Sequence, residues 1–442
     1  MFKFSRLFLS LITGLAVLSP VAVGIFPVFP MIVILAAVVA LSIYAFHNPG
    51  VVVKRIALVT VSICVAITLT DLMARPLLSS LEERPPDIFA HPLPDLLQVY
   101  RFNKSLDFRG STFGDLAALS GKKEWREQRE LVFQTDSFGF RNHLDAENKG
   151  LLDLIILGDS YGVGDSTSQV KTWSSILSQQ YGLNLYNLSM DGASPWQEYV
   201  DLLLEVDRLK TRERTTVLWL LFTGNDLIDP SYPAFKREEL PWLGTFRRLV
   251  HKVNTYRYES PLRRLFLLRG QHSDREDVVA RTLPDGRTVL FDQAYAQLAA
   301  LSLDEVIHHA NYQNVKNAFA AMKHLTDERH LRLVVAVAPS KEEVYDWVLN
   351  QRSPWSFVST GPSGFAAAIK DLSDAYGVTY LDLKPAMVDA ARKSYENSGE
   401  LLWWRDDTHW SALGHQTAAQ AVYASLLIDV HNHRAAATEQ AR

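Results

Sequence analysis

The sequence predicts an α/β fold in which a five-stranded parallel sheet lies between two layers of helices, a three-layer α/β/α sandwich. Short apolar runs recur along the chain, as expected for buried parallel strands. Helical patterns separate them, and such alternation is typical of a parallel sheet with helices on both faces. The five runs are 154–157, 185–188, 216–222, 331–337 and 378–383.

The helices between these runs are indicated by capping signals. Ser194 precedes a proline and is followed three residues later by Gln197. Ser302 and Ser340 are each followed by a glutamate at the same spacing. A serine with Glu or Gln three positions on is the capping box that starts many helices, and proline is favoured in the first turn. A last helix is expected over 411–428.

The N-terminal part is strongly apolar and predicts membrane helices. Residues 7–46 contain no charged residue, whereas one span needs only about 20 apolar residues. A further apolar segment covers 56–70. We therefore expect about three transmembrane helices within 1–73, followed by a proline-rich linker over 74–94.

The cations around these segments predict the orientation. Lys3 and Arg6 precede the first segment, and Lys54 and Arg55 lie before the last. With both groups on the cytoplasmic side, three spans place the remainder outside, in the periplasm of a bacterial inner (plasma) membrane. Two alternatives stay open: two spans with a cytoplasmic domain, and a cleaved signal peptide.

Composition excludes several classes of protein. The 442 residues carry a net charge of −4, without the basic excess of a nucleic-acid binder. The single cysteine, Cys64, excludes an intramolecular disulfide framework. His308 and His309 have no partners at metal-ligand spacing. We expect no metal, no cofactor and no nucleic acid.

An insertion at about 229–301 interrupts the domain, which we place at 95–432. It contains a basic run with interleaved apolar residues over 246–269, and a hairpin is expected around Pro284 to Gly286. The basic run is either an amphipathic helical insertion with a solvated face, or a lid or surface for lipid headgroups or an anionic polymer.

Four motifs follow the strand ends or precede the last helix. Ser160 lies just after the first strand, Gly192 after the second and Asn225 after the third. The carboxyl ends of parallel strands form the edge where α/β proteins bind ligands. His409 precedes the last helix, with Asp406 three residues before it. A serine hydroxyl needs such a base and an acid that orients it.

Together the four motifs resemble the signature blocks of the SGNH (GDSL) hydrolase family. The resemblance implies a flavodoxin-like SGNH fold, with Ser160 as nucleophile, His409 as base and Asp406 as acid. It also implies an oxyanion hole made by Ser160, Gly192 and Asn225. Gly139-Phe-Arg-Asn and Thr172-Trp173 are similar to the envelope-associated branch of the family.

The identity of the acid has an alternative. The family spacing selects Asp406. The string Asp407-Thr-His-Trp is also similar to the signature of alginate-type O-acetyltransferases, and that resemblance selects Asp407. There the Asp-His pair precedes the serine, whereas here it follows, so Asp406 is preferred.

The implied reaction is hydrolysis or transfer of an acyl ester, with an acylated carbohydrate or lipid as substrate. We favour acetyl groups of an envelope or exopolysaccharide, with a membrane acyltransferase or a polysaccharide synthesis or secretion complex as partner. A lipid esterase or lysophospholipase and a non-catalytic scaffold are the alternatives. Four tryptophans could stack on sugars or pack in the core: Trp196, Trp403, Trp404 and Trp410.

Overall fold

The computed structural model describes residues 69–70, 73, 90–92, 99–144, 150–228, 277–356 and 358–427. The chain divides into two compact units, one of Met1–Glu82 and Arg237–Asp274, the other of Glu83–Lys236 and Arg275–Arg442. Nearly all described residues belong to the second unit. The predicted membrane segments, apart from three residues, and the basic run of the insertion lie outside the described residues. Within the described ranges, no helix has both the length and the apolar character that a membrane span requires.

The central sheet has five parallel strands, as the sequence predicts. Their order is β11-β10-β7-β5-β6, and β7 pairs with β5 and β10 in parallel register. Strand β5, which leads to Ser160, therefore lies between β6 and β7. The strands are β5 (Leu154–Gly158), β6 (Leu185–Asn187), β7 (Thr216–Phe222), β10 (Arg332–Ala338) and β11 (Thr379–Asp382).

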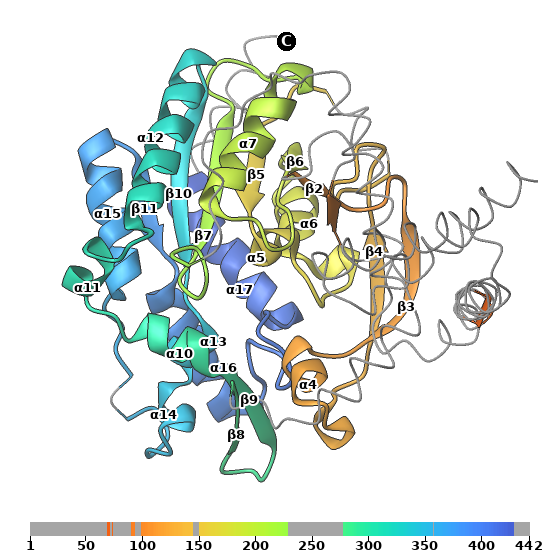
Figure 1. Ribbon diagram of the computed structural model, residues 1–442, viewed down its shortest axis with the longest axis vertical. Helices are drawn as coiled ribbons and strands as arrows, with labels where there is room; N and C mark the ends of the chain where they lie inside the picture. The colour runs from red at the N-terminus through yellow and green to blue at the C-terminus, as the bar shows by residue number, and fades with distance from the viewer. Residues whose placement is uncertain are drawn as a thin grey trace, which may run out of the picture. The chain divides into compact units, whose positions relative to one another are not determined.

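Helices cover both faces of this sheet (Figure 1). Successive strand residues point to opposite faces, so each strand contributes to two separate cores. Side chains of α7 (Pro195–Glu205), α12 (Tyr312–Glu328) and α15 (Gly364–Tyr376) belong to one core. Side chains of α6 (Trp173–Gln179), α16 (Lys384–Ser398) and α17 (Ala412–Val422) belong to the other. The three-layer sandwich is thereby confirmed.

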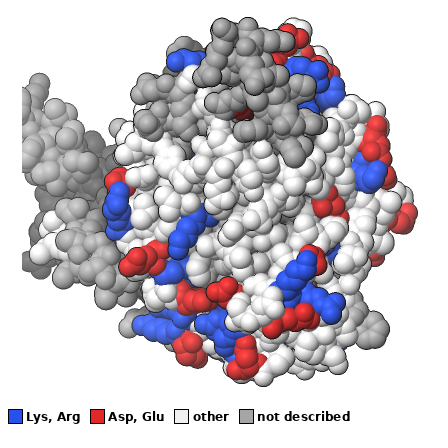
Figure 2. Space-filling view, turned by 180° about the vertical axis from the view of Figure 1, so that it is seen from behind, with Lys and Arg blue, Asp and Glu red and all other residues white. Residues whose placement is uncertain are grey.

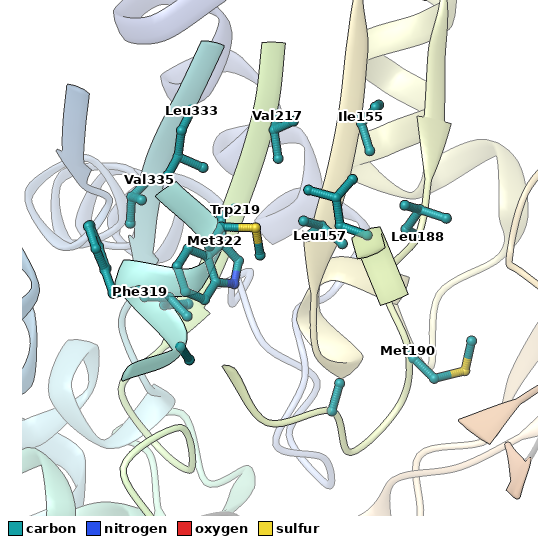
Figure 3. Packing of buried hydrophobic residues seen from close by; sticks show 14 of the residues in the cluster. Ile155, Leu157, Leu188, Met190, Val217, Trp219, Phe319, Met322, Leu333 and Val335 are labelled. Atoms are coloured by element: carbon teal, nitrogen blue, oxygen red, sulfur yellow. The ribbon is translucent and has the colours of Figure 1, made fainter. Parts of the chain in front are cut away.

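Strand β7 shows how the alternation separates the two cores. Val217 and Trp219 belong to the core on the α12 side, where Figure 3 shows Trp219 near Phe319 and Met322. The ring centroids of Trp219 and Phe319 are 5.7 Å apart. Leu218, on the opposite face, packs in the second core. Every residue of β7 is buried, as expected from the continuous apolar run over 216–222.

Elements outside the sandwich bring further residues to the carboxyl edge of the sheet. The antiparallel strands β3 (Asp107–Thr112) and β4 (Arg129–Gln134) flank the short helix α4 (Asp115–Ser120) in the chain. The hairpin predicted around Pro284 is formed by β8 (Val278–Thr282) and β9 (Thr288–Asp292). The remaining elements include β1 (His91–Pro92), β2 (Tyr100–Arg101), α5 (Ser160–Val163), α10 (Gln293–Ala299), α11 (Leu303–Ile307), α13 (Lys341–Val344) and α14 (Asp346–Leu349).

The predicted helix starts are largely confirmed. Ser302 and Ser340 form complete capping boxes, and Ser411 caps α17 by accepting from the backbone of Gly414. Ser194 is the exception, because its side chain makes no cap hydrogen bond and its hydroxyl is buried. The proline that follows it is in the first turn of α7, so the helix begins where expected without the capping box. Helix α17 ends at Val422 and continues as a π-helix over Tyr423–Leu427, where the described residues end.

The surface of this unit mixes charges of both signs. Figure 2 shows basic and acidic residues side by side around a broad region without charged residues. Several pairs are spaced four residues apart on helices, such as Lys323 with Asp327 and Lys370 with Asp374. Exposed pairs of this kind contribute only about 0.3–0.5 kcal/mol each. They contribute little to the fold, which depends mainly on the two cores.

Candidate active site

Ser160 lies at the carboxyl end of β5, as the sequence predicts. It is the first residue of α5, and the preceding Asp159 caps this helix by accepting from the backbone N–H of Tyr161 at 2.9 Å. Only 7% of Ser160 is exposed. The short strand and the turn that follows it thus place the hydroxyl at the sheet edge, where the residue is mostly buried.

His409 reaches this hydroxyl from a position 249 residues later in the chain. Its Nε2 lies 2.8 Å from Ser160 Oγ, and its Nδ1 lies 2.7 Å from Asp407 Oδ1. Serine, imidazole and carboxylate therefore form one hydrogen-bonded series. This is the geometry that a nucleophile, its base and an orienting acid require.

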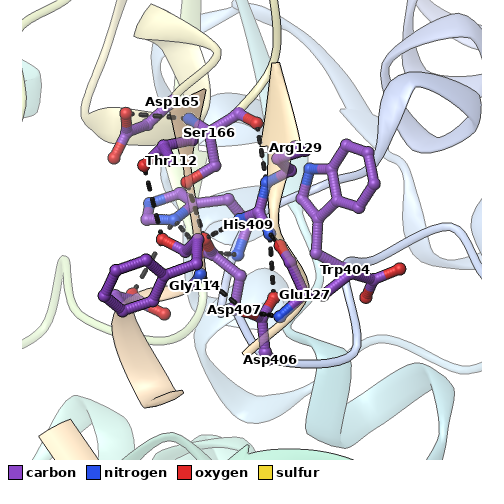
Figure 4. Close-up of polar contacts among 12 residues, drawn as sticks. Thr112, Gly114, Glu127, Arg129, Asp165, Ser166, Trp404, Asp406, Asp407 and His409 are labelled. Carbon is purple, nitrogen blue, oxygen red and sulfur yellow. Dashed lines mark hydrogen bonds and ion pairs between the residues drawn. The ribbon is translucent and has the colours of Figure 1, made fainter. Parts of the chain in front are cut away.

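Asp407, and not Asp406, contacts the imidazole. Asp407 is fully buried and also accepts from the backbone N–H of His409 at 3.0 Å and from Ser166 Oγ at 2.6 Å. Asp406 instead accepts from the backbone N–H groups of Gly114 and Glu127, each at 2.7 Å. The preference for Asp406 is therefore wrong, and the alternative, Asp407, has the expected position (Figure 4).

Arg129 connects the two aspartates and was not found from the sequence. Its guanidinium donates to Asp406 Oδ1 at 2.9 Å and makes a short ion pair with Asp407 Oδ2. It also lies over the ring of Trp404, 4.5 Å from the centroid. The sequence offers no local signal for this residue, because its partners are 277 and 278 residues away.

The surroundings of His409 favour its protonated form. Burial lowers the pKa of the imidazole, but the carboxylates of Asp407, Asp115 and Asp165 outweigh this effect and raise the pKa to about 10. The three carboxylates therefore stabilise the imidazolium relative to the neutral ring.

The two other predicted oxyanion residues follow the strands on either side of β5. Gly192 comes after β6, is exposed and has a φ of +67°, a backbone conformation that favours glycine. Asn225 comes after β7, and its side chain hydrogen-bonds to Asp159, directly beside Ser160. Burial raises the pKa of Asp159 to about 6, against the opposing effect of the Tyr161 N–H, His409 and Asn225. Their role in binding an oxyanion remains a prediction.

The upstream motif Gly139-Phe-Arg-Asn is hydrogen-bonded to the segment that follows Ser160. Arg141 is buried and donates to the carbonyl oxygens of Gly164 and Thr167, each at 2.6 Å. The side chain of Asn142 pairs with both backbone groups of Asn187, at 2.9 and 3.0 Å. Trp173, from the downstream motif, donates to the carbonyl of Gly162 at 3.1 Å. These motifs therefore have a structural role around Ser160.

The tryptophans differ in their access to a ligand. Trp410 and Trp403 are fully buried, and Trp410 packs edge-on against Tyr161, so neither can stack on a sugar. Trp404 is half-buried, with Arg129 over its ring. Trp196 is half-buried and lines a small pocket with Asp226 and other residues. Sugar stacking is thus excluded for Trp410 and remains a prediction for Trp196 and Trp404.

A single group of potential metal ligands occurs among the described residues. Asp115, Asp407 and His409 each offer an atom within 4.8 Å of the others. The imidazole and Asp407 are already joined by a hydrogen bond. We interpret the group as part of the triad's own network.

A protein-family model matches the C-terminal part of the chain. Residues 298–441 match the family model described as SGNH hydrolase-like domain, acetyltransferase AlgX. This segment contains Asp407 and His409 but not Ser160. No curated protein matches the chain.

Similar solved structures include esterases and lipolytic proteins. Esterase EstA from Pseudoalteromonas sp. is 12% identical, with a TM-score of 0.31, over 62% of this chain and 95% of that chain. A putative lipolytic protein of the G-D-S-L family from Desulfitobacterium hafniense is 11% identical, with a TM-score of 0.30, over 62% and 98%. The C-terminal part of the chain, which contains Asp407 and His409, is therefore similar to the SGNH hydrolase-like domain described for acetyltransferase AlgX.

Proposed function

We propose that this protein is a serine-dependent acyl-ester hydrolase or O-acyltransferase that acts on acetyl groups of an envelope or exopolysaccharide. The observation that carries the proposal is the contact of 2.8 Å between Ser160 Oγ and His409 Nε2, with Asp407 on the opposite ring nitrogen. The acetyltransferase family match supports the acyl class.

In the proposed reaction, His409 Nε2 takes the proton of Ser160 as the alkoxide attacks the ester carbonyl. The backbone N–H groups of Ser160 and Gly192 and the amide of Asn225 hold the oxyanion. His409 then gives the proton to the leaving alcohol, which departs and leaves an acyl-serine. Water or a sugar hydroxyl then loses a proton to His409 and attacks the acyl group, and His409 returns that proton to Ser160 Oγ as the acyl–serine bond breaks.

The location of the reaction forms part of the proposal. The cations at positions 3, 6, 54 and 55 support an inner-membrane anchor with the domain in the periplasm. There the domain could receive acetyl groups from a membrane acyltransferase or act within a polysaccharide synthesis or secretion complex.

Substrate length distinguishes this proposal from the lipid esterase alternative. We expect the purified full chain to hydrolyse p-nitrophenyl acetate and to release acetate from O-acetylated xylan, with both activities lost in Ser160→Ala. We expect no release of fatty acid from lysophosphatidylcholine micelles. Fatty acid release without action on acetyl esters would contradict the proposal and favour a lipid esterase.

A further inference from the structure

A second carboxylate faces the same ring nitrogen as the triad aspartate. Asp115 Oδ2, at the start of α4, lies 3.8 Å from His409 Nδ1, which is also bonded to Asp407. Asp115 lies in the segment between β3 and β4, nearly 300 residues before the histidine. It lies outside the motifs that led to the site.

Thr408 links this carboxylate to the histidine loop. Asp115 Oδ1 accepts from the backbone N–H of Thr408 at 2.8 Å, and Asp115 Oδ2 accepts a short hydrogen bond from the Thr408 hydroxyl. That hydroxyl is 3.3 Å from His409 Nδ1. Asp115 therefore contacts the residue next to the base through two hydrogen bonds and faces the base itself.

The backbone around Asp115 is fixed against the same loop. The N–H of Gly114 donates to Asp406 Oδ2 at 2.7 Å, and the N–H of Ala117 donates to the Asp406 carbonyl at 3.1 Å. A Cβ at position 114 would lie 1.8 Å from that carbonyl oxygen, so only glycine allows this approach. The close contact holds Asp115 at a defined distance from the imidazole.

We propose that Asp115 is a positioning residue, a second carboxylate that orients His409 and stabilises its protonated form. The effect of Asp115 on the reaction rate rests on the proposed function. A carboxylate within about 4–6 Å of a histidine raises its pKa, and Asp115 is among the causes of the raised pKa of His409. Because 23% of the Asp115 side chain is exposed, solvent weakens its effect relative to that of buried Asp407.

Other charged and titratable groups influence the pKa of His409 or of the residues that contact it. These groups must remain unchanged in the variants that test Asp115. They are Asp407, Asp159, Tyr161, Asp165, Arg129, Lys341 and His415.

The direction of the pH effect follows from the role of the base. His409 must be neutral to accept the proton of Ser160, so kcat/KM rises with pH through the pKa of His409. Removing the Asp115 charge lowers that pKa and moves the rise to lower pH, by about 1 unit. On the alkaline plateau the rate should fall by up to about tenfold, because one pKa unit of imidazolium stabilisation corresponds to that factor.

The test compares Asp115→Asn and Asp115→Ala with Asp107→Asn. The asparagine keeps an oxygen that can accept from Thr408 but removes the charge. Asp107 is an exposed aspartate of the neighbouring strand β3, bonded to Gln134, and serves as the control. The readouts are the pH profile of p-nitrophenyl acetate hydrolysis and an NMR titration of ¹³C-labelled histidine, with His409 assigned by its loss in His409→Gln.

We expect both Asp115 variants to lower the pKa of His409 and Asp107→Asn to leave it unchanged. If His409 kept its wild-type pKa in Asp115→Asn, the inference would be overturned, even if the rate of p-nitrophenyl acetate hydrolysis were reduced. The NMR readout does not require turnover. An inactive wild type would therefore contradict the proposed function, whereas the role of Asp115 would still be decided by the titration.

Discussion

Asp407→Asn should lower kcat by about 10⁴, the loss seen when a triad aspartate becomes an amide. Four donors converge on the Asp407 carboxylate: His409 Nδ1, the His409 backbone N–H, Arg129 and Ser166. An asparagine offers one acceptor oxygen, so its NH₂ must face either the imidazole or Arg129. In the first case Nδ1 becomes an acceptor, Nε2 carries the proton, and the base cannot deprotonate Ser160.

Asp406→Asn is the matched control, since Asp406 is equally buried and adjacent in the chain. Its contacts are with Gly114, Glu127 and Arg129, and none is with the imidazole. We expect it to reduce thermal stability while keeping most of the kcat of the folded fraction. The measurement is kcat for p-nitrophenyl acetate together with thermal unfolding. An equal loss of kcat in both variants would show that Asp406 has the orienting role.

Arg129→Met should destabilise the domain by about 3–5 kcal/mol, the usual cost of leaving a buried charge without its partner. The Arg129 side chain is 6% exposed, and its two partners are more deeply buried. Without the guanidinium, Asp406 and Asp407 face each other's charge in a site of low dielectric constant. The free energy of unfolding in urea measures the effect.

Arg109→Met provides the control for this prediction. Arg109 is on the partner strand β3, is 66% exposed and pairs with Asp107 at 3.4 Å. Exposed pairs contribute at most about 1 kcal/mol, so this variant should remain close to wild type. Adding Asp406→Asn to Arg129→Met removes one of the two charges and should recover part of the loss. Equal stability of the two arginine variants would show that the ion pairs of Arg129 with Asp406 and Asp407 do not stabilise the fold.

The fold was predictable because its signals are local. Strand β7 consists of seven buried residues, and a continuous apolar run is the expected pattern for such a strand. Ser302 and Ser340 have their capping partners three residues away, so sequence spacing suffices. Ser194 has the same spacing, but its hydroxyl is buried and makes no cap hydrogen bond, so the spacing alone does not establish a capping box.

The contact between Ser160 and His409 was also predictable, whereas the motifs around His409 offered both Asp406 and Asp407 as its carboxylate partner. Ser160 and His409 lie in motifs with a recognisable order along the chain. The choice between Asp406 and Asp407 depends on donors from residues 114–129, and no spacing near position 409 reveals them. The burial of a tryptophan likewise depends on residues distant in the chain. The sequence therefore did not distinguish buried Trp410 from half-buried Trp404.

Labelling by a serine-directed fluorophosphonate tests the nucleophile most directly. We expect the intact chain to be labelled once, at Ser160 by peptide mass spectrometry, and Ser160→Ala and His409→Gln to remain unlabelled. Labelling at another serine, or a folded wild-type protein that never labels, would contradict this expectation and would favour a scaffold without catalysis.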